Sequence, residues 1–135
     1  IQRLLSSDND AAVDAARYLC SGLCHQHVEV SSASLPVLPF LLERLDTADE
    51  VLEVEILDIL LGFAIGVSRV RTRSYQLRFL GRTSVTAEPG WLTQLRTELN
   101  EQRSRLETYL CRDSSTLAEF ARDILAELDE QPTDG

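Results

Sequence analysis

The chain has 135 residues, which is enough for one domain with a continuous core, and its formal net charge is −9. This acidity disfavours nucleic acid and anionic membranes as partners over most of the surface and suits a basic protein partner. All 13 basic residues are arginine. The absence of lysine excludes P-loop and Schiff-base chemistry, because both need that side chain.

Several features bear on where the protein works. No run of about 18 apolar residues occurs, so we expect no membrane span, and no signal-peptide pattern is visible. The three cysteines are too few and odd in number for a disulfide framework, which points to a reducing cytoplasm. The chain starts at Ile1 and has no methionine, so we expect it to be a fragment of a longer protein.

Two helices are predicted in the first 45 residues. The stretch DNDAAVDAARYLCSGLCH repeats apolar residues at helical spacing, and Asp8 at its start precedes the apolar run as a cap for the free N–H groups. A second helix begins near Ser34, with Pro36 in its first turn, and Pro39 is expected to loosen its start. The apolar stripe of this second helix consists of Leu38, Leu41, Leu42 and Leu45.

A third helix is predicted from Thr47 or Ala48 to Ile65. Its acidic residues Glu50, Glu53 and Asp58 are expected to lie off the buried side. The inner side is expected to consist of Val51, Val54, Leu57, Leu60, Leu61 and Ala64.

Residues 66–90 differ from the rest, since they hold five arginines and one acidic residue. We expect this stretch to be a long basic insert loop. After it, one helix is predicted over about Gly90–Cys111 and another over about Ser115–Glu130, with Asp113 or Ser114 as the cap between them.

The helical pattern recurs along the chain. Residues 1–24, 34–65 and 91–130 each end one helix in leucine, turn through small or acidic residues, and open a second helix. A helix–turn–helix unit that recurs at a period of about 40 residues indicates an α-solenoid. We therefore predict an all-α fold in a single domain over residues 1–135, built from about two and a half helical hairpins and the basic insert.

The stretch LCHQHVEVSSASLPVLPFLLERL carries a resemblance to a known family. It is similar to a bacterial group of HEAT-repeat, or armadillo-like, proteins, and the matching positions are His25, Gln26, Ala33, Ser34, Pro39, Phe40, Leu41 and Leu42. The resemblance covers residues 1–65 well and 91–130 loosely, and it does not extend to 66–90. It implies a non-enzymatic interaction protein, similar to immunity proteins that occlude a basic toxin or nuclease. Some HEAT-like proteins instead process DNA or act as lyases on pigments.

One candidate partner-binding surface is acidic. Asp46, Asp49, Glu50 and Glu53 crowd the start of the third predicted helix, and like charges three or four residues apart repel one another. A solvated helix face is the alternative, since charge runs are usually that. General acid–base catalysis is not expected here, because no histidine or nucleophile is placed near these carboxylates. We expect no catalytic residues and no cofactor.

The second candidate surface is the basic insert, where Arg71, Arg73, Tyr75 and Arg78 interleave cations with an aromatic ring. Arginine beside aromatic residues is enriched in protein interfaces and also grips single-stranded nucleic acid. Three alternatives stay open for this segment: docking on the chain's own acidic face or disorder, a protein partner, and nucleic acid. For the chain as a whole the predicted function is protein binding, with nucleic-acid binding through this segment as the alternative function.

A possible metal site is the cluster of Cys20, Cys24, His25 and His27. A structural zinc site needs ligand pairs from separate segments, whereas these four lie within one short stretch. Cys20 falls on the apolar face, and His25 can satisfy the terminal carbonyls of the first helix. We therefore predict no metal site.

Overall fold

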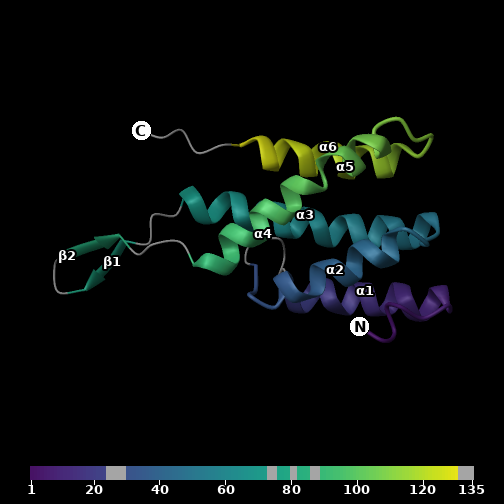
Figure 1. Cartoon of the computed structure of the whole chain (residues 1–135), viewed down its shortest axis with the longest axis horizontal. Coiled ribbons are helices and arrows are strands. Elements are labelled where there is room, and N and C mark those ends of the chain that lie inside the picture. Colours follow the sequence, from purple (N-terminus) through teal and green to yellow (C-terminus); the bar gives the residue numbers. More distant parts are fainter. Residues whose placement is uncertain (24–29, 73–75, 80–81, 86–88, 131–135) are drawn as a thin grey trace.

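The computed structural model describes residues 1–23, 30–72, 76–79, 82–85 and 89–130. Within them lie six α-helices and one β-hairpin (Figure 1). In chain order the elements are α1 (Asn9–Leu23), α2 (Ser34–Leu45), α3 (Glu50–Thr72), β1 (Gln76–Phe79), β2 (Arg82–Val85), α4 (Gly90–Glu101), α5 (Arg103–Tyr109) and α6 (Ser115–Asp129). Apart from the hairpin, the described elements are helical, which agrees with the predicted all-α class.

The helices lie in two layers. Helix α3 packs between α1 and α6 in one layer, and α2 contacts α4 in the other (Figure 1). Helix α3 also contacts α2 and α4, so it joins the two layers. The buried apolar residues form one hydrophobic cluster to which every helix contributes.

The predicted caps explain where two helices start. Asp8 Oδ1 accepts hydrogen bonds from the backbone N–H groups of Asp10 at 3.1 Å and Ala11 at 3.4 Å, ahead of α1. Ser114 Oγ accepts one from the N–H of Leu117 at 3.5 Å at the start of α6. Helix α2 continues through Pro39, and the N–H of Ser34 donates to the carbonyl of Ser31 at 3.0 Å, which is the spacing of a 3₁₀ turn at the start of the helix.

The buried side of α3 differs from the prediction. Val51, which was expected inside, is 58% exposed, whereas Glu53, which was expected outside, is 7% exposed. Helix α3 is covered by helices on more than one side, so its buried arc is wider than a single stripe and takes in Glu53, whereas Val51 in the first turn lies outside the covered arc. The fully buried large side chains of α3 are Leu52, Ile56, Leu57, Ile59, Leu60 and Phe63.

The prediction of an insert loop over residues 66–90 is wrong for its described parts. Helix α3 continues to Thr72, seven residues past the predicted end, and Val67 in this extension is buried. The strands β1 and β2 then pair antiparallel, with Gln76 opposite Val85 and Phe79 opposite Arg82. The hairpin projects beyond the helical layers (Figure 1).

The helix predicted over Gly90–Cys111 is also interrupted. Gln102 adopts φ −85° and ψ 3°, and it separates α4 from α5. Beside the break, the side chain of Asn100 donates to the carbonyl of Arg96 at 2.9 Å. Such side-chain bonding competes with the regular backbone ladder of a helix, a competition that apolar periodicity does not reveal.

One buried guanidinium holds the N-terminal segment on the core. Arg44 is 6% exposed and donates to the carbonyls of Leu4 at 3.0 Å and Ser6 at 3.3 Å. It also donates to the side chains of Asn9 at 3.1 Å and Thr47 at 2.8 Å. Leu4 itself is fully buried. Because Arg44 donates hydrogen bonds to acceptors in three segments, it ties α2 to the residues that precede α1.

The structure makes Gly66 a sensitive position. A Cβ atom there would lie 2.6 Å from Cβ and 2.8 Å from Cγ1 of Val30, closer than atoms can pack. We therefore expect Gly66→Ala to lower the free energy of unfolding by about 1–3 kcal/mol. Gly22→Ala is the matched control, because nothing lies within 4 Å of its added Cβ and alanine favours a helix. Urea denaturation of both variants checks this, and an unchanged stability of Gly66→Ala would contradict the close approach.

Candidate functional site

The acidic residues predicted as a partner surface surround the turn between α2 and α3, but they do different things there. Asp46 follows the last residue of α2 and forms an ion pair with Arg105 of α5. Asp49 caps α3, since its Oδ1 accepts the N–H of Leu52 at 3.0 Å. These two carboxylates are therefore engaged in structural contacts within the chain.

Arg105 satisfies the end of α2 from another helix. Its Nη1 donates to the carbonyl of Leu42 in the last turn of α2 at 3.1 Å, while its Nη2 pairs with Asp46. The last carbonyls of a helix lack partners within the helix, and a cation is favoured at this end. Arg105 thus fixes the position of α2 relative to α5.

Glu53 is the carboxylate that the fold encloses. Nη2 of Arg112 donates to its Oε1 at 2.7 Å and to its Oε2 at 2.8 Å. The guanidinium carbon of Arg112 also lies 5.2 Å from the ring centroid of Tyr109, in cation–π range. A buried carboxylate needs such a partner, because water no longer solvates it.

The same contacts shift two titrations. Burial and the negative charge of Glu53 raise the pKa of the Tyr109 phenol above its usual range. The hydrogen bond and charge of Glu53 raise the pKa of the Arg112 guanidinium. Tyr109 therefore stays neutral and Arg112 stays charged near neutral pH, so neither is a candidate for proton transfer there.

Glu50 and Asp113 are two acidic residues of this region whose carboxylates, in the part of the chain that the structure describes, neither pair with an arginine nor cap a helix, although the negative charge of Glu50 contributes to the raised pKa of Arg112. Both are exposed, and among the described residues neither forms an ion pair. They border a surface hollow of about 520 Å³ between the α2–α3 turn and the start of α6. Its lining residues are Asp46, Ala48, Glu50, Glu53, Arg112, Asp113, Ser114 and Leu117. Glu50 also lines a neighbouring hollow of about 310 Å³ on the other side.

The predicted basic surface is placed apart from the acidic one. Arg71 lies in the last turn of α3 and Arg78 lies on β1, whereas Arg73 and Tyr75 lie outside the described residues. The acidic turn and the hairpin are at opposite ends of α3 (Figure 1). The two predicted surfaces are therefore separate, and within one molecule the hairpin strands do not cover the acidic turn.

Of the cysteine–histidine cluster, only Cys20 lies in the described part of the chain. It is half-buried on α1, and its Sγ lies 3.8 Å from Oδ2 of Asp58 on α3. Cys24, His25 and His27 fall outside the described residues. Within the residues that the structure describes, no group of three or more metal-ligating side chains comes together.

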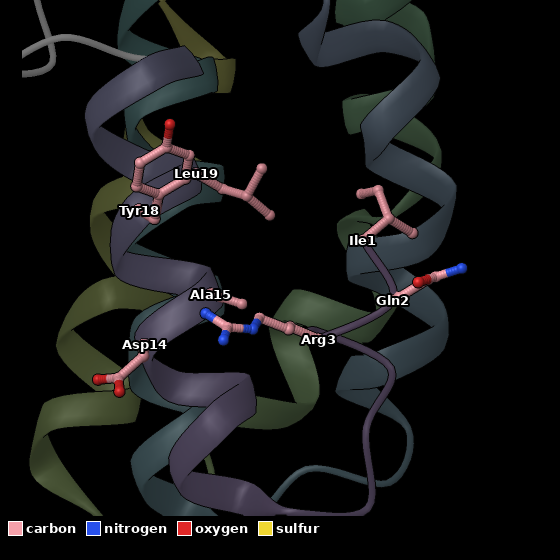
Figure 2. A pocket seen from close by; sticks show the side chains of 7 residues that line it. All are labelled: Ile1, Gln2, Arg3, Asp14, Ala15, Tyr18 and Leu19. Carbon is pink, nitrogen blue, oxygen red and sulfur yellow. The ribbon is translucent and has the colours of Figure 1, made fainter.

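A further hollow lies where sequence reasoning gave no signal. It measures about 780 Å³ and separates the first three residues from α1 (Figure 2). Ile1 faces Leu19 across it, and Tyr18 on its rim is 82% exposed. Its remaining lining residues are Gln2, Arg3, Asp14 and Ala15.

Sequence reasoning missed Arg105, Tyr109 and Arg112. Each acidic residue that Arg105 and Arg112 neutralise lies 59 positions away in the sequence. Helical spacing relates residues three or four positions apart, so it carries no information about such pairs. The only local signal is that arginines interrupt the acidic last third of the chain.

We also find that no helix among the described residues meets the length and hydropathy needed for a bilayer span.

The ion pair between Glu53 and Arg112 predicts unequal mutational effects. Arg112→Ala leaves a buried carboxylate without a counter-ion, so we expect it to lower the free energy of unfolding by about 1–3 kcal/mol. Glu53→Gln leaves the Arg112 side chain, which is 48% exposed, free to be hydrated, so its effect should be smaller.

Arg17→Ala is the control for this comparison, since Arg17 is 61% exposed and its pair with Glu55 lies at the surface. Its effect should be within about 1 kcal/mol. Denaturant titrations at neutral pH measure all three variants. A loss for Arg112→Ala no larger than that for Arg17→Ala would contradict a structural role of the buried pair.

Comparison of the chain with protein-family models, with curated proteins and with solved structures gives no match. The similarity to HEAT-repeat proteins therefore rests on the stretch LCHQHVEVSSASLPVLPFLLERL and stays a prediction.

Proposed function

We propose that the chain is a non-enzymatic protein-interaction module that binds a basic protein at the hollow beside the α2–α3 turn. The observation that carries the proposal is that the acidic residues around this turn fall into two groups, those paired with arginine and those left unpaired. Asp46 and Glu53 are neutralised by arginines of the same chain, whereas Glu50 and Asp113 remain exposed without an ion partner among the described residues. The α2–α3 turn, held in place by arginines of the same chain, thus presents two exposed carboxylates that a cationic side chain can bind.

The contacts that hold this turn favour binding, because they fix the backbone around the hollow before a partner binds. Arg105 holds the end of α2, and Arg112 holds the first turns of α3. A surface that loses little conformational freedom on association binds more tightly than a mobile one with the same contacts. Complementary charge also speeds association and makes it sensitive to salt.

The fold and the partner class extend this proposal. Two layers of neighbouring helices support a HEAT-like α-solenoid of about two and a half hairpins, a fold whose curved surfaces bind other macromolecules. Together with the resemblance to bacterial HEAT-like proteins, the acidity of the chain supports an immunity or antagonist protein that occludes a basic toxin or nuclease in the cytoplasm.

The proposal is tested with purified basic proteins encoded beside this chain. We expect one of them to bind, with an affinity that falls as salt rises, and Glu50→Arg with Asp113→Arg should weaken binding at least tenfold. Calorimetric titration measures both. Asp14→Arg is the matched control, since it reverses one exposed acid on α1 and should change binding little. Equal affinity of the double variant and the wild type would refute the proposed surface.

The alternative function is nucleic-acid binding through the basic segment. The observation in its favour is that the hairpin, with Arg78 on β1 and Arg82 on β2, projects beyond the helices (Figure 1). Tight binding of a labelled single-stranded oligonucleotide at physiological salt, lost in a chain with Arg71→Ala and Arg73→Ala, would favour this alternative over a protein partner.

A further inference from the structure

The second hollow lined by Glu50 is a groove between α3 and α6 that adjoins the proposed surface and has an apolar floor. It measures about 310 Å³ and is lined by Glu50, Val51, Val54, Glu55 and Thr116. Val51 is 58% exposed, which makes it the most exposed large apolar side chain in residues 50–68 of α3, and Val54 is half-buried in the lining of the groove. A valine this open, beside a half-buried one, leaves apolar surface that an incoming side chain can cover.

The walls of the groove are held in place. Helices α3 and α6 pack against each other, and the carboxylate of Glu55 accepts a hydrogen bond from Nε of Arg17 at 2.8 Å. On the opposite side, Glu53 is fixed by Arg112. Glu50 stands between the groove and the larger hollow, since it lines both. An occupant of the groove therefore meets the free carboxylate of Glu50 at its edge and that of Asp113 beyond it.

We propose that this groove receives a segment of the basic partner in which an aliphatic side chain neighbours two cationic ones, an inference that rests on the proposed function. The aliphatic side chain covers Val51 and Val54. One cation pairs with Glu50, and the other reaches Asp113 in the adjoining hollow. The groove thereby makes binding depend on the shape of the partner segment as well as on its charge.

Charge complementarity selects this occupant over others. An acidic segment would face the unpaired carboxylates of Glu50 and Asp113, while Arg112 is already bound to Glu53 and Arg17 to Glu55. A wholly apolar segment would cover Glu50 without giving it a counter-charge, which is costly. A segment that carries both an aliphatic and a cationic side chain covers the valines of the floor and also pairs with Glu50 at the edge.

The probe is a capped synthetic peptide, Arg-Leu-Arg-Arg, added to the whole chain labelled with ¹⁵N. We expect its binding to shift the amide signals of Val51, Val54 and Thr116, and we expect the peptide Gln-Leu-Gln-Gln to leave them in place. Val51→Ser should weaken binding of the first peptide about threefold to tenfold, because the leucine loses its apolar contact. Tyr18→Ser is the control, since it removes a more exposed apolar side chain on α1 and should change nothing.

Three results would overturn the inference: peptide-induced shifts that lie elsewhere, shifts of the same size with the glutamine peptide, or unchanged affinity of Val51→Ser. The basic partner protein then separates this failure from that of the proposed function. If its binding depends on Glu50 and Asp113 but not on Val51, the function stands and the groove inference is wrong. If its binding depends on none of the three, both are wrong.

Discussion

The burial of α3 between α1 and α6 is the constraint on which the rest of the structure depends. Its side chains supply a large part of the core, and it also touches the helices of the second layer. A helix covered on several sides cannot keep all its polar residues in water. Glu53 is the residue that this geometry draws inside, and its charge then requires the arginine that α5 and the turn after it bring close.

This requirement shapes the surface as well as the interior. Arg105 and Arg112 both come from the region of α5, and both reach acids around the α2–α3 turn. They neutralise two negative charges of a crowded cluster, Asp46 after the end of α2 and Glu53 in α3, which lowers the repulsion among the acids around this turn. What remains outside is concentrated at Glu50 and Asp113, beside the exposed valine of α3. Stability and the proposed recognition thus draw on different acids of the same cluster.

The sequence allowed the helices to be predicted more closely than their contacts. Periodicity together with a cap residue located α1 and α6, because Asp8 and Ser114 act within three residues of themselves. Periodicity predicted the wrong burial for Val51 and Glu53, because it assumes a single buried stripe and α3 is covered on several sides. It also failed at Gln102, where a backbone change breaks a continuous apolar pattern. The acidic cluster was recognisable, but which of its members stay free depends on arginines brought near only by layer packing.

The buried guanidinium of Arg44 has a consequence for the chain's first residues. Two of its acceptors are main-chain carbonyls, those of Leu4 and Ser6, so no side-chain substitution at these positions can remove them. Loss of residues 1–6 would remove these two acceptors and the buried side chain of Leu4, and it would leave Asn9 and Thr47 as the partners of the guanidinium. A chain that lacks these residues should therefore unfold at a lower temperature. The segment before α1 thus contributes to the stability of the helical layers although it belongs to no helix.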